Sequence, residues 1–303
     1  MRAIIVHGGA GRWSIVKSKS DIENVLRGIK IAVEKGWEVL ENWGDGVKAC
    51  EEAIKVLEDY EIFNAGYGSA LNIEGEVEMD ASIMVGTNPP KIGIVGAIKG
   101  VKNPISIAKR IMEQGRSIMI VGNGAKIKAK EWNFEEVNLI TEKSKRILER
   151  WKERYLNKGR YEPDTGDTVG CAVFDGNDIV VGVSTGGIVG KEVGRLGDSA
   201  LPGAGFFANH SFGIVCTGIG EEIIKNFISF RAVNLYSMGF NLNEVGRILT
   251  KEVMKEWLGL IMVNNKGEVG WAYNTNAMPF GYMKEDMKEP FIGGFEKFKF
   301  KNE

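Results

Sequence analysis

The chain has 303 residues, 44% of them hydrophobic and 26% charged, which is the composition of a globular protein with ample material for a core. Its 39 basic and 40 acidic side chains nearly cancel, so the sequence argues against nucleic acid or an anionic membrane as a partner. The three cysteines have no CxxC spacing, which argues against a zinc site, and the two histidines are too few for a histidine-rich metal centre. The N-terminal apolar run is too short for a signal peptide or a membrane span, so we expect a cytoplasmic protein.

The first 60 residues predict one strand followed by two helices. Apolar residues at 3–6 form a short strand that ends in His7 and a run of glycines. From Asp21 to Leu40 the apolar residues recur at spacings of three and four, which predicts an amphipathic helix, and Asp45 is the expected N-cap of the next helix. Two helices in succession before a run of strands predict a layer of helices over one side of a sheet.

The middle of the chain mixes strands and helices. We expect a hairpin from 77–86 and 91–100, helices over 103–114, 123–132 and 141–155, and a strand over 117–121. Residues 156–167 combine charge, glycine and proline and are the least ordered part by composition. A dinucleotide-binding interpretation of IMIVGNGAK fails because Ile127 stands at the third glycine position, and Gly190-Lys191 lacks the Ser or Thr of a phosphate loop.

Hairpins predominate after residue 168. We expect a hairpin from 168–175 and 178–185 around Gly176-Asn177, a strand over 212–216, a helix from Glu222 to about Met238, a helix from Asn243 to Trp257, and a hairpin over 260–275 around Lys266-Gly267. The chain ends in a basic tail, which we expect to be frayed.

Thr168 stands at the junction between the low-order segment and a buried apolar strand. Cutting the bond after Asp167 would give Thr168 a free α-amine beside its hydroxyl, which places a nucleophile and its base on one residue. Such an amine titrates near pH ~8, so a useful fraction is unprotonated at neutral pH. A threonine at this position also serves simply as a strand former, so the surrounding sequence has to decide between the two roles.

Polar residues mark the ends of three predicted strands in the second half. Thr168 begins one strand, Thr185 ends its partner, and Thr217 ends a third. Adjacent strand ends gather such residues at one edge of a sheet, where sites are commonly built. Gly218 and Gly220 permit close approach of the backbone, and the helix that starts after Gly220 offers free N–H groups to a developing oxyanion.

Arg195 and Asp198 carry opposite charges three residues apart on a glycine-rich loop. One interpretation is a surface salt bridge. The other is a clamp for a zwitterion, in which the guanidinium holds an α-carboxylate in two hydrogen bonds and the carboxylate accepts from an α-ammonium. The clamp indicates an amino acid or the end of a peptide as the ligand.

The loop after the second helix is rich in glycine and aromatic residues, with Gly66 and Gly68 on either side of Tyr67. It is either a packed turn or an arrangement of backbone carbonyls around a hard cation, because oxygen ligands need no charged side chain.

Seven short motifs occur in this chain in a fixed order: HGGAG at 7–11, FNAGYGSALN at 63–72, EMDASIM at 78–84, GDTVGCAVFD at 166–175, GVSTGG at 182–187, GRLGDSALPGAG at 194–205 and CTGIGEE at 216–222. Each motif by itself is weak. Together, from His7 to Glu221, they resemble the plant-type asparaginase and isoaspartyl peptidase family of N-terminal-nucleophile hydrolases.

The resemblance implies an α+β fold, a four-layer αββα sandwich, in a single domain over 1–303. The chain would be an inactive precursor that cuts itself between Asp167 and Thr168 into an α chain (1–167) and a β chain (168–303). Thr168 would then attack the side-chain amide of asparagine or the β-linked bond of an isoaspartyl dipeptide through an acyl-enzyme, with no cofactor for catalysis. The family implies a dimer of αβ heterodimers.

The resemblance also implies individual roles: a hydrogen bond from Thr185 to the nucleophile, an oxyanion hole from Thr217 and the Gly218 N–H, substrate binding by Arg195, Asp198, Gly218 and Gly220, and support of Thr168 by Asn64. A structural sodium ion would be held by the main-chain carbonyls of Leu57, Glu58, Tyr60, Phe63, Ala65 and Tyr67.

One departure concerns processing. Many members of the family carry glycine before the nucleophile, whereas this chain has Asp167, as in the threonine-endopeptidase branch, and the preceding linker is short and charged.

Two hydrolases remain as alternatives, glycosylasparaginase and a protein-cleaving threonine peptidase. The lack of a secretion signal and of paired cysteines argues against glycosylasparaginase. The lack of a long insertion that could hold a protein substrate argues against the threonine peptidase. An amino-acid-binding protein without catalysis that keeps the Arg195/Asp198 clamp is the alternative from another class.

Overall fold

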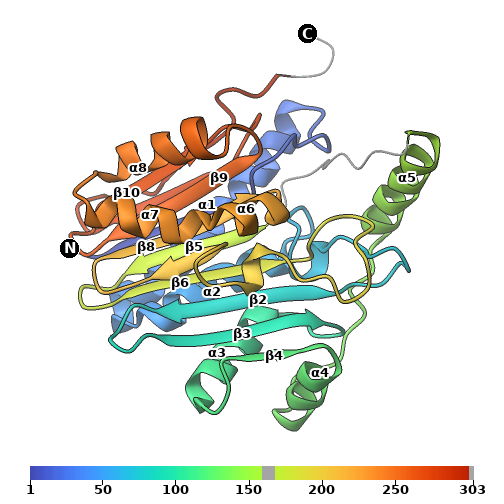
Figure 1. Ribbon diagram of the computed structural model, residues 1–303, viewed down its shortest axis with the longest axis horizontal. Helices are drawn as coiled ribbons and strands as arrows, with labels where there is room; N and C mark the ends of the chain where they lie inside the picture. The colour runs from blue at the N-terminus through green and yellow to red at the C-terminus, as the bar shows by residue number, and fades with distance from the viewer. Residues whose placement is uncertain (159–167, 300–303) are drawn as a thin grey trace.

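The computed structural model describes residues 1–158 and 168–299, and their strands form two sheets (Figure 1). The eight-stranded sheet has the order β12 (Phe291–Gly293), β11 (Phe280–Lys284), β1 (Ala3–His7), β5 (Val169–Phe174), β6 (Ile179–Thr185), β2 (Met79–Val85), β3 (Lys91–Ile98), β4 (Met119–Val121). The four-stranded sheet has the order β10 (Val269–Tyr273), β9 (Leu258–Asn264), β8 (Phe212–Gly218), β7 (Phe206–Ala208).

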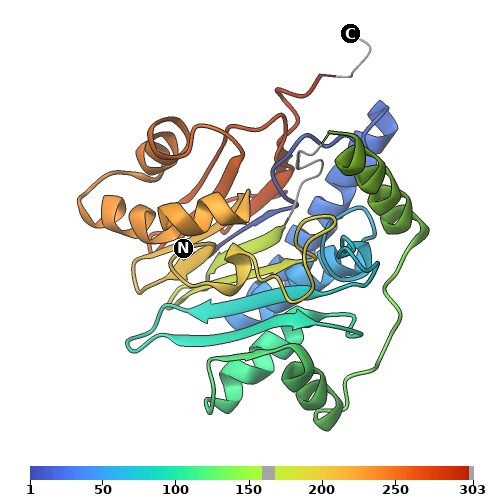
Figure 2. The same cartoon turned by 45° about the vertical axis from the view of Figure 1, so that its right-hand side comes forward.

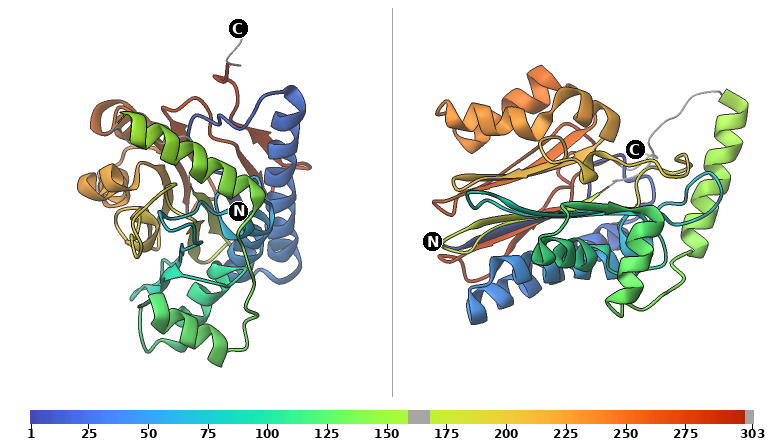
Figure 3. Two further views of the ribbon diagram at one scale, coloured as in Figure 1. Left: turned by 90° about the vertical axis from the view of Figure 1, so that its right-hand side faces the viewer. Right: turned by 60° about the horizontal axis from the view of Figure 1, so that its bottom comes forward.

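Helices cover the outer faces of both sheets, so the molecule is built of helices, sheet, sheet and helices (Figure 3). The helices of the larger sheet are α1 (Lys19–Trp43), α2 (Gly46–Asp59) and α3 (Pro104–Gln114), and those of the smaller sheet are α6 (Gly220–Asn226), α7 (Ile228–Ser237) and α8 (Leu242–Ile248). Two more helices lie at the periphery: α4 (Gly122–Glu131) is beside the β3–β4 edge of the larger sheet, at the bottom of Figure 2, and α5 (Glu142–Lys158) is at its right-hand side. The mixed architecture agrees with the predicted α+β sandwich.

Three hydrophobic clusters fill the three spaces between these layers. The first packs α1–α3 against the eight-stranded sheet and includes Ile29 and Ile83. The second lies between the sheets, with Val181 from one and Ile261 from the other. The third joins the smaller sheet to α6–α8. Each sheet therefore buries both faces, which explains why its strands read as continuous apolar runs.

The strand β5 lies in the middle of the larger sheet, between β1 and β6, and pairs antiparallel with both. His7 of β1 is opposite Gly170, and Ser184 of β6 is opposite Val169. The next residues outward, Thr168 and Thr185, therefore meet at the end of this strand pair, as the sequence predicts for adjacent strand ends.

The predicted N-cap of α2 is confirmed, because the side chain of Asp45 accepts from the Lys48 N–H at 2.9 Å. The helix α1 starts at Lys19, two residues before the expected Asp21, because Ser18 closes a capping box with Asp21. The helix α1 ends at Gly44, whose φ of 63° is the left-handed conformation that glycine adopts without strain.

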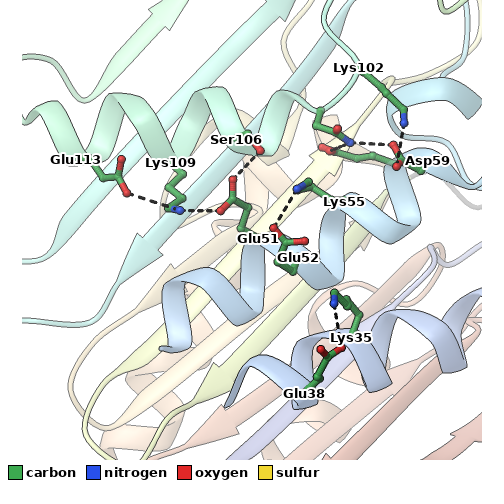
Figure 4. A network of polar contacts seen from close by, with 12 residues as sticks. Lys35, Glu38, Glu51, Glu52, Lys55, Asp59, Lys102, Ser106, Lys109 and Glu113 are labelled. Atoms are coloured by element: carbon green, nitrogen blue, oxygen red, sulfur yellow. Dashed lines mark hydrogen bonds and ion pairs between the residues drawn. The ribbon is translucent and has the colours of Figure 1, made fainter. Parts of the chain in front are cut away.

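Ion pairs tie α2 to α3 on the outside of the larger sheet (Figure 4). Glu51 accepts from the Ser106 hydroxyl at 2.6 Å and from the Lys109 ammonium at 2.7 Å, and Asp59 pairs with Lys102 at 3.0 Å. These contacts fix α3 over the hairpin of β2 and β3 that the sequence predicts and the structure confirms.

Two helix predictions are wrong at the C-terminal side. The helix expected from Glu222 to Met238 is broken into α6 and α7 at Phe227, whose φ is 47°. The helix expected from Asn243 to Trp257 is shorter, because α8 ends at Ile248 and a single π turn continues only to Val253. The strands β11 and β12 were not predicted, and β11 completes the sheet beside β1. The expected frayed basic tail lies partly outside the described residues. No helix within 1–158 or 168–299 is long and apolar enough to cross a membrane.

Packing of α3 on the larger sheet depends on Gly93. A Cβ at this position would lie 1.9 Å from the Ala108 carbonyl oxygen and 2.6 Å from the Met112 nitrogen. Both are backbone atoms, so we expect Gly93→Ala to lower the free energy of unfolding by about 2 to 3 kcal/mol in chemical denaturation. The matched control is Gly124→Ala in α4, where the nearest atom is 3.6 Å away; it should stabilise slightly, and equal effects would contradict the packing argument.

Candidate active site

Thr168 is 4% exposed and directly precedes β5 at the edge described above. The partner strand ends in Thr185, which is opposite Asp80 of β2 and accepts from the Gly187 N–H at 2.9 Å. The structure therefore brings Thr168 and Thr185 together. Asp167 lies outside the described residues, so Thr168 is the one residue of the predicted cleavage bond whose position is known.

His7 lies on the other side of β5, fully buried, and its Nδ1 accepts from the Gly9 N–H at 3.2 Å. Burial lowers the pKa of His7 to about 3, with the main chain of Thr168 acting in the opposite direction, so the imidazole is neutral at physiological pH. A Cβ on Gly170 would lie 2.4 Å from Nε2, which explains why a glycine faces the ring. His7 begins the first of the seven motifs, but its residue type and position in the sequence indicate no role.

Thr217 and Gly218 come from the end of β8 in the smaller sheet. The Thr217 hydroxyl accepts from the Ala10 N–H at 3.1 Å, which joins this strand end to the loop after β1. Gly218 has a φ of 144°, and a Cβ there would lie 1.9 Å from the Trp257 carbonyl oxygen, so only glycine fits. Both sheets thus contribute strand ends to the same region.

Asn64 approaches this region from the loop after α2. Its Nδ2 donates to the Gly187 carbonyl at 2.6 Å, and its Oδ1 accepts from the Ala70 N–H at 2.7 Å. Its carbonyl accepts from the Gly186 N–H at 3.1 Å. Asn64 is therefore held against the two glycines that follow Thr185.

Arg195 and Asp198 converge on Gly220 at the start of α6. Arg195 Nη2 and Asp198 Oδ1 lie 2.9 and 2.8 Å from the position that a Cβ on Gly220 would occupy. Arg195 Nη1 lies 3.3 Å from the corresponding position on Gly187, the residue that Asn64 contacts. The missing side chains at both glycines leave room between the two charged groups and the strand ends.

Within the described part of the chain, the guanidinium of Arg195 forms its ion pair with Glu221 and not with Asp198. Nε and Nη2 of Arg195 both donate to Glu221 Oε1, at 3.0 and 2.8 Å. The sequence motifs indicate no role for Glu221, and no local pattern indicates this pairing, since the two residues are 26 positions apart.

Asp198 is 5% exposed, and its Oδ2 has no hydrogen-bond partner among the described residues. Burial raises the pKa of Asp198 to about 7, opposed by the positive charge of Arg195 and reinforced by the carboxylates of Glu221 and Asp80. A buried carboxylate with an unused oxygen is suited to accept from a cationic ligand.

In the glycine-rich loop after α2, two carbonyl oxygens lie close to glycines. A Cβ on Gly66 would lie 2.4 Å from the Glu58 carbonyl oxygen, and one on Gly68 would lie 1.9 Å from that of Phe63. Main-chain oxygens are ligands that a hard cation accepts, so these two carbonyls are of the donor type that the predicted ion needs. The ammonium of Lys143 donates to the Glu61 carbonyl on the same loop.

Beside this loop the carboxyl group of Glu58 is completely buried. Its oxygens accept from Asn103 Nδ2 at 3.0 Å and the Ile105 N–H at 3.1 Å. Burial nevertheless raises the pKa of Glu58 to about 8. Among the described residues no group of three or more His, Cys, Asp and Glu side chains forms a metal site, so any cation here depends on backbone oxygens.

Comparison with known proteins gives consistent matches along the chain. Residues 1–292 match the protein family described as Asparaginase. A plant-type L-asparaginase of Pyrococcus horikoshii is 44% identical, covering 97% of this chain and 100% of its own length. An isoaspartyl peptidase/L-asparaginase of Mus musculus is 37% identical, covering 93% of this chain and 87% of its own length.

The raised pKa of Asp198 predicts a pH dependence of ligand binding. The carboxyl group is protonated below pH about 7 and then cannot pair with an ammonium. We expect the dissociation constant of L-aspartate, measured by calorimetry, to rise about tenfold from pH 8 to pH 6. Asp198→Asn should bind more weakly with little pH dependence, and a flat wild-type profile would rule out this role for Asp198.

Proposed function

The chain belongs to the asparaginase family, and we propose that it hydrolyses the side-chain amide of L-asparagine and the β-aspartyl bond of isoaspartyl dipeptides. The observation that carries this proposal is the placement of Thr168 beside Thr185 at a sheet edge that Arg195 and Asp198 also border. The relatives named as L-asparaginase and as isoaspartyl peptidase/L-asparaginase support both reactions. The two substrates share the α-carboxylate and α-ammonium, so the clamp serves either one.

We infer that the chain is one domain, a four-layer αββα sandwich of the N-terminal-nucleophile hydrolase type, and that it matures by its own chemistry. The Thr168 hydroxyl attacks the Asp167 carbonyl, an N→O acyl shift gives an ester, and water releases an α chain (1–167) and a β chain (168–303). In the larger sheet β1–β4 belong to the first part and β5, β6, β11 and β12 to the second. This interleaving supports a cut that leaves the fold intact.

In the mature enzyme the free α-amine of Thr168 acts as the base for its own hydroxyl. The hydroxyl oxygen attacks the amide carbon, and the amine takes the hydroxyl proton. The Thr217 hydroxyl and the Gly218 N–H stabilise the negative charge on the former carbonyl oxygen, while Thr185 holds the nucleophile in place. The amine returns the proton to the leaving nitrogen, which departs as ammonia or as an amino acid.

Hydrolysis of the resulting ester completes the cycle. The α-amine removes a proton from water, the hydroxide attacks the ester carbon, and aspartate leaves as the Thr168 oxygen regains a proton. No cofactor takes part in these steps. Asn64 supports the region through its hydrogen bond to Gly187, which lies two residues beyond Thr185.

Substrate binding uses the clamp described above. Arg195 holds the α-carboxylate and Asp198 accepts from the α-ammonium, with the backbone at Gly218 and Gly220 close to the substrate. Because Glu221 now occupies the Nε and Nη2 donors of Arg195, the substrate carboxylate has to share or displace it. The pairing of two αβ units into a dimer of heterodimers stays a prediction.

We further propose a structural sodium ion in the loop after α2. The carbonyl oxygens of Leu57, Glu58, Tyr60, Phe63, Ala65 and Tyr67 would hold it. The ion supplies no step of the reaction; by rigidifying the loop it would fix Asn64, whose contacts to Ala70 and Gly187 depend on the loop's path.

Replacement of Thr168 tests the nucleophile. Thr168→Ala should remain one chain of 303 residues and release no aspartate from asparagine, with an unchanged circular dichroism spectrum. Thr168→Ser, which keeps a hydroxyl, should still cleave and turn over slowly. Intact mass identifies fragments of 167 and 136 residues (303 − 167 = 136), and turnover by Thr168→Ala at the wild-type level would refute the assignment.

Replacement of sodium tests the proposed ion site. At 100 times its dissociation constant a bound ion adds about 2.7 kcal/mol to the free energy of unfolding. We therefore expect dialysis from sodium chloride into choline chloride of equal ionic strength to lower Tm by several degrees, and activity to fall with it, both reversibly. Identical melting and activity in the two salts would exclude a stabilising sodium ion.

A further inference from the structure

We propose that Asp80, in the predicted α chain, is a positioning residue that holds Arg195 and Asp198 of the predicted β chain in their binding geometry. This inference rests on the proposed function of the clamp. Asp80 lies on β2, its side chain is completely buried, and neither the resemblance nor the relatives' names assign it a role.

The sequence of β2 divides its side chains between two environments. Met79, Ala81, Ile83 and Val85 belong to the cluster beneath α1–α3. Met84 belongs to the cluster between the sheets. By this alternation Asp80 faces the second sheet, where a charged group is costly unless it is hydrogen-bonded.

A β-bulge explains one of the two bonds of Asp80. The pairing of β2 with β3 passes from Met79 opposite Ile98 to Ala81 opposite Val95, which leaves two residues of β3 facing Asp80. One of them, Ala97, has a φ of 47°, and its N–H donates to Asp80 Oδ1 at 2.8 Å. The carboxylate thus accepts from the Ala97 N–H, which the bulge leaves without a partner in the ladder between β2 and β3.

The second oxygen of the same carboxylate holds the clamp. Asp80 Oδ2 accepts from the Gly197 N–H at 3.0 Å, and Gly197 is the neighbour of Asp198. A Cβ on Gly197 would lie 2.8 Å from Arg195 Nη1, so the guanidinium rests directly against this peptide. Any shift of Gly197 therefore moves both groups that would bind the substrate.

The neighbours of Asp80 hold the same loop at other points. Glu78 accepts from the Gly194 N–H at 3.0 Å with its carboxylate and from the Lys191 ammonium at 2.7 Å with its carbonyl. The Ser82 hydroxyl donates to the Ser199 carbonyl at 2.6 Å. Residues 78, 80 and 82, the first directly before β2 and the other two on it, thus fix the loop on both sides of Arg195 and Asp198.

The bulge also receives an apolar residue of the loop. Leu196 stands between Arg195 and Gly197, and its Cδ2 lies 2.7 Å from the position of a Cβ on Gly96, the other bulge residue. Only a glycine admits Leu196 this closely. The loop is thus located by packing at Leu196 and by the carboxylate at Gly197.

An ionised carboxylate is specifically suited to this position. Its two oxygens each accept from a different N–H donor, whereas an asparagine offers one acceptor and would direct its NH2 group at the other donor. The charge of Asp80 also faces the ammonium of Lys191, which is 3% exposed. Asp80→Asn therefore keeps the size of the side chain and removes one of its two bonds to the loop and the bulge.

The experiment compares steady-state kinetics of wild type and Asp80→Asn with L-asparagine. We expect KM to rise at least tenfold, kcat to change less than threefold, and the inhibition constant of L-aspartate to rise in parallel with KM. Glu51→Gln is the matched control, because Glu51 is also a buried carboxylate with two partners but lies on α2 and bonds to α3. It should leave KM unchanged.

An unchanged KM in folded Asp80→Asn would overturn the proposal, and so would a loss of kcat equal to the change in KM. If Asp80→Asn fails to fold, Ser82→Ala tests the same surface with a smaller expected rise in KM, and an unchanged KM there is equally negative. If the wild type hydrolyses no asparagine, the proposed function fails, and calorimetry with L-aspartate decides the inference separately. Weaker binding by Asp80→Asn supports it; equal binding, or none by the wild type, overturns it.

Discussion

The structure depends on the pairing of β5 with a neighbour on each side. Hydrogen bonds to β1 and β6 fix the strand from its first residues, so Thr168, which directly precedes it, has a defined place. The same pairing interleaves segments from the two halves of the sequence within one sheet. A cut before Thr168 would release one new amine at the sheet edge and leave the cores between the layers in place.

Several charged groups around this edge are buried or half-buried, and burying a charge lowers stability unless the group is hydrogen-bonded or paired. The carboxylate of Asp80 accepts from two backbone N–H groups, the ammonium of Lys191 donates to the Glu78 carbonyl, and the guanidinium of Arg195 donates to the Glu221 carboxylate. Asp198 differs, because one of its oxygens has no hydrogen-bond partner among the described residues and its pKa is raised to about 7. The bonded groups define the geometry, and the under-bonded carboxylate is the one placed to receive a ligand.

Local pattern was sufficient for most elements of the first half. The apolar spacing located α1, and the cap at Asp45 located α2, because short-range hydrogen bonds decide helix starts. The cap at Ser18 was not predicted, so α1 starts two residues earlier than expected. The local pattern predicted the wrong structure from Glu222 to Met238. The apolar spacing continues across Phe227, but the backbone at Phe227 is left-handed. The local pattern also failed for β11, which gains its strand conformation from pairing with β1.

The sequence by itself determined the strand ends that carry Thr168, Thr185 and Thr217, and the family to which their motifs belong, because these signals lie within short stretches of chain. Only the tertiary structure decided which distant groups meet. The pairing of Arg195 with Glu221, the neutral His7 behind β5 and the bridge from Asp80 to Gly197 join residues that no periodicity relates. Such contacts arise from sheet register and from the packing of the layers, which single-sequence patterns do not specify.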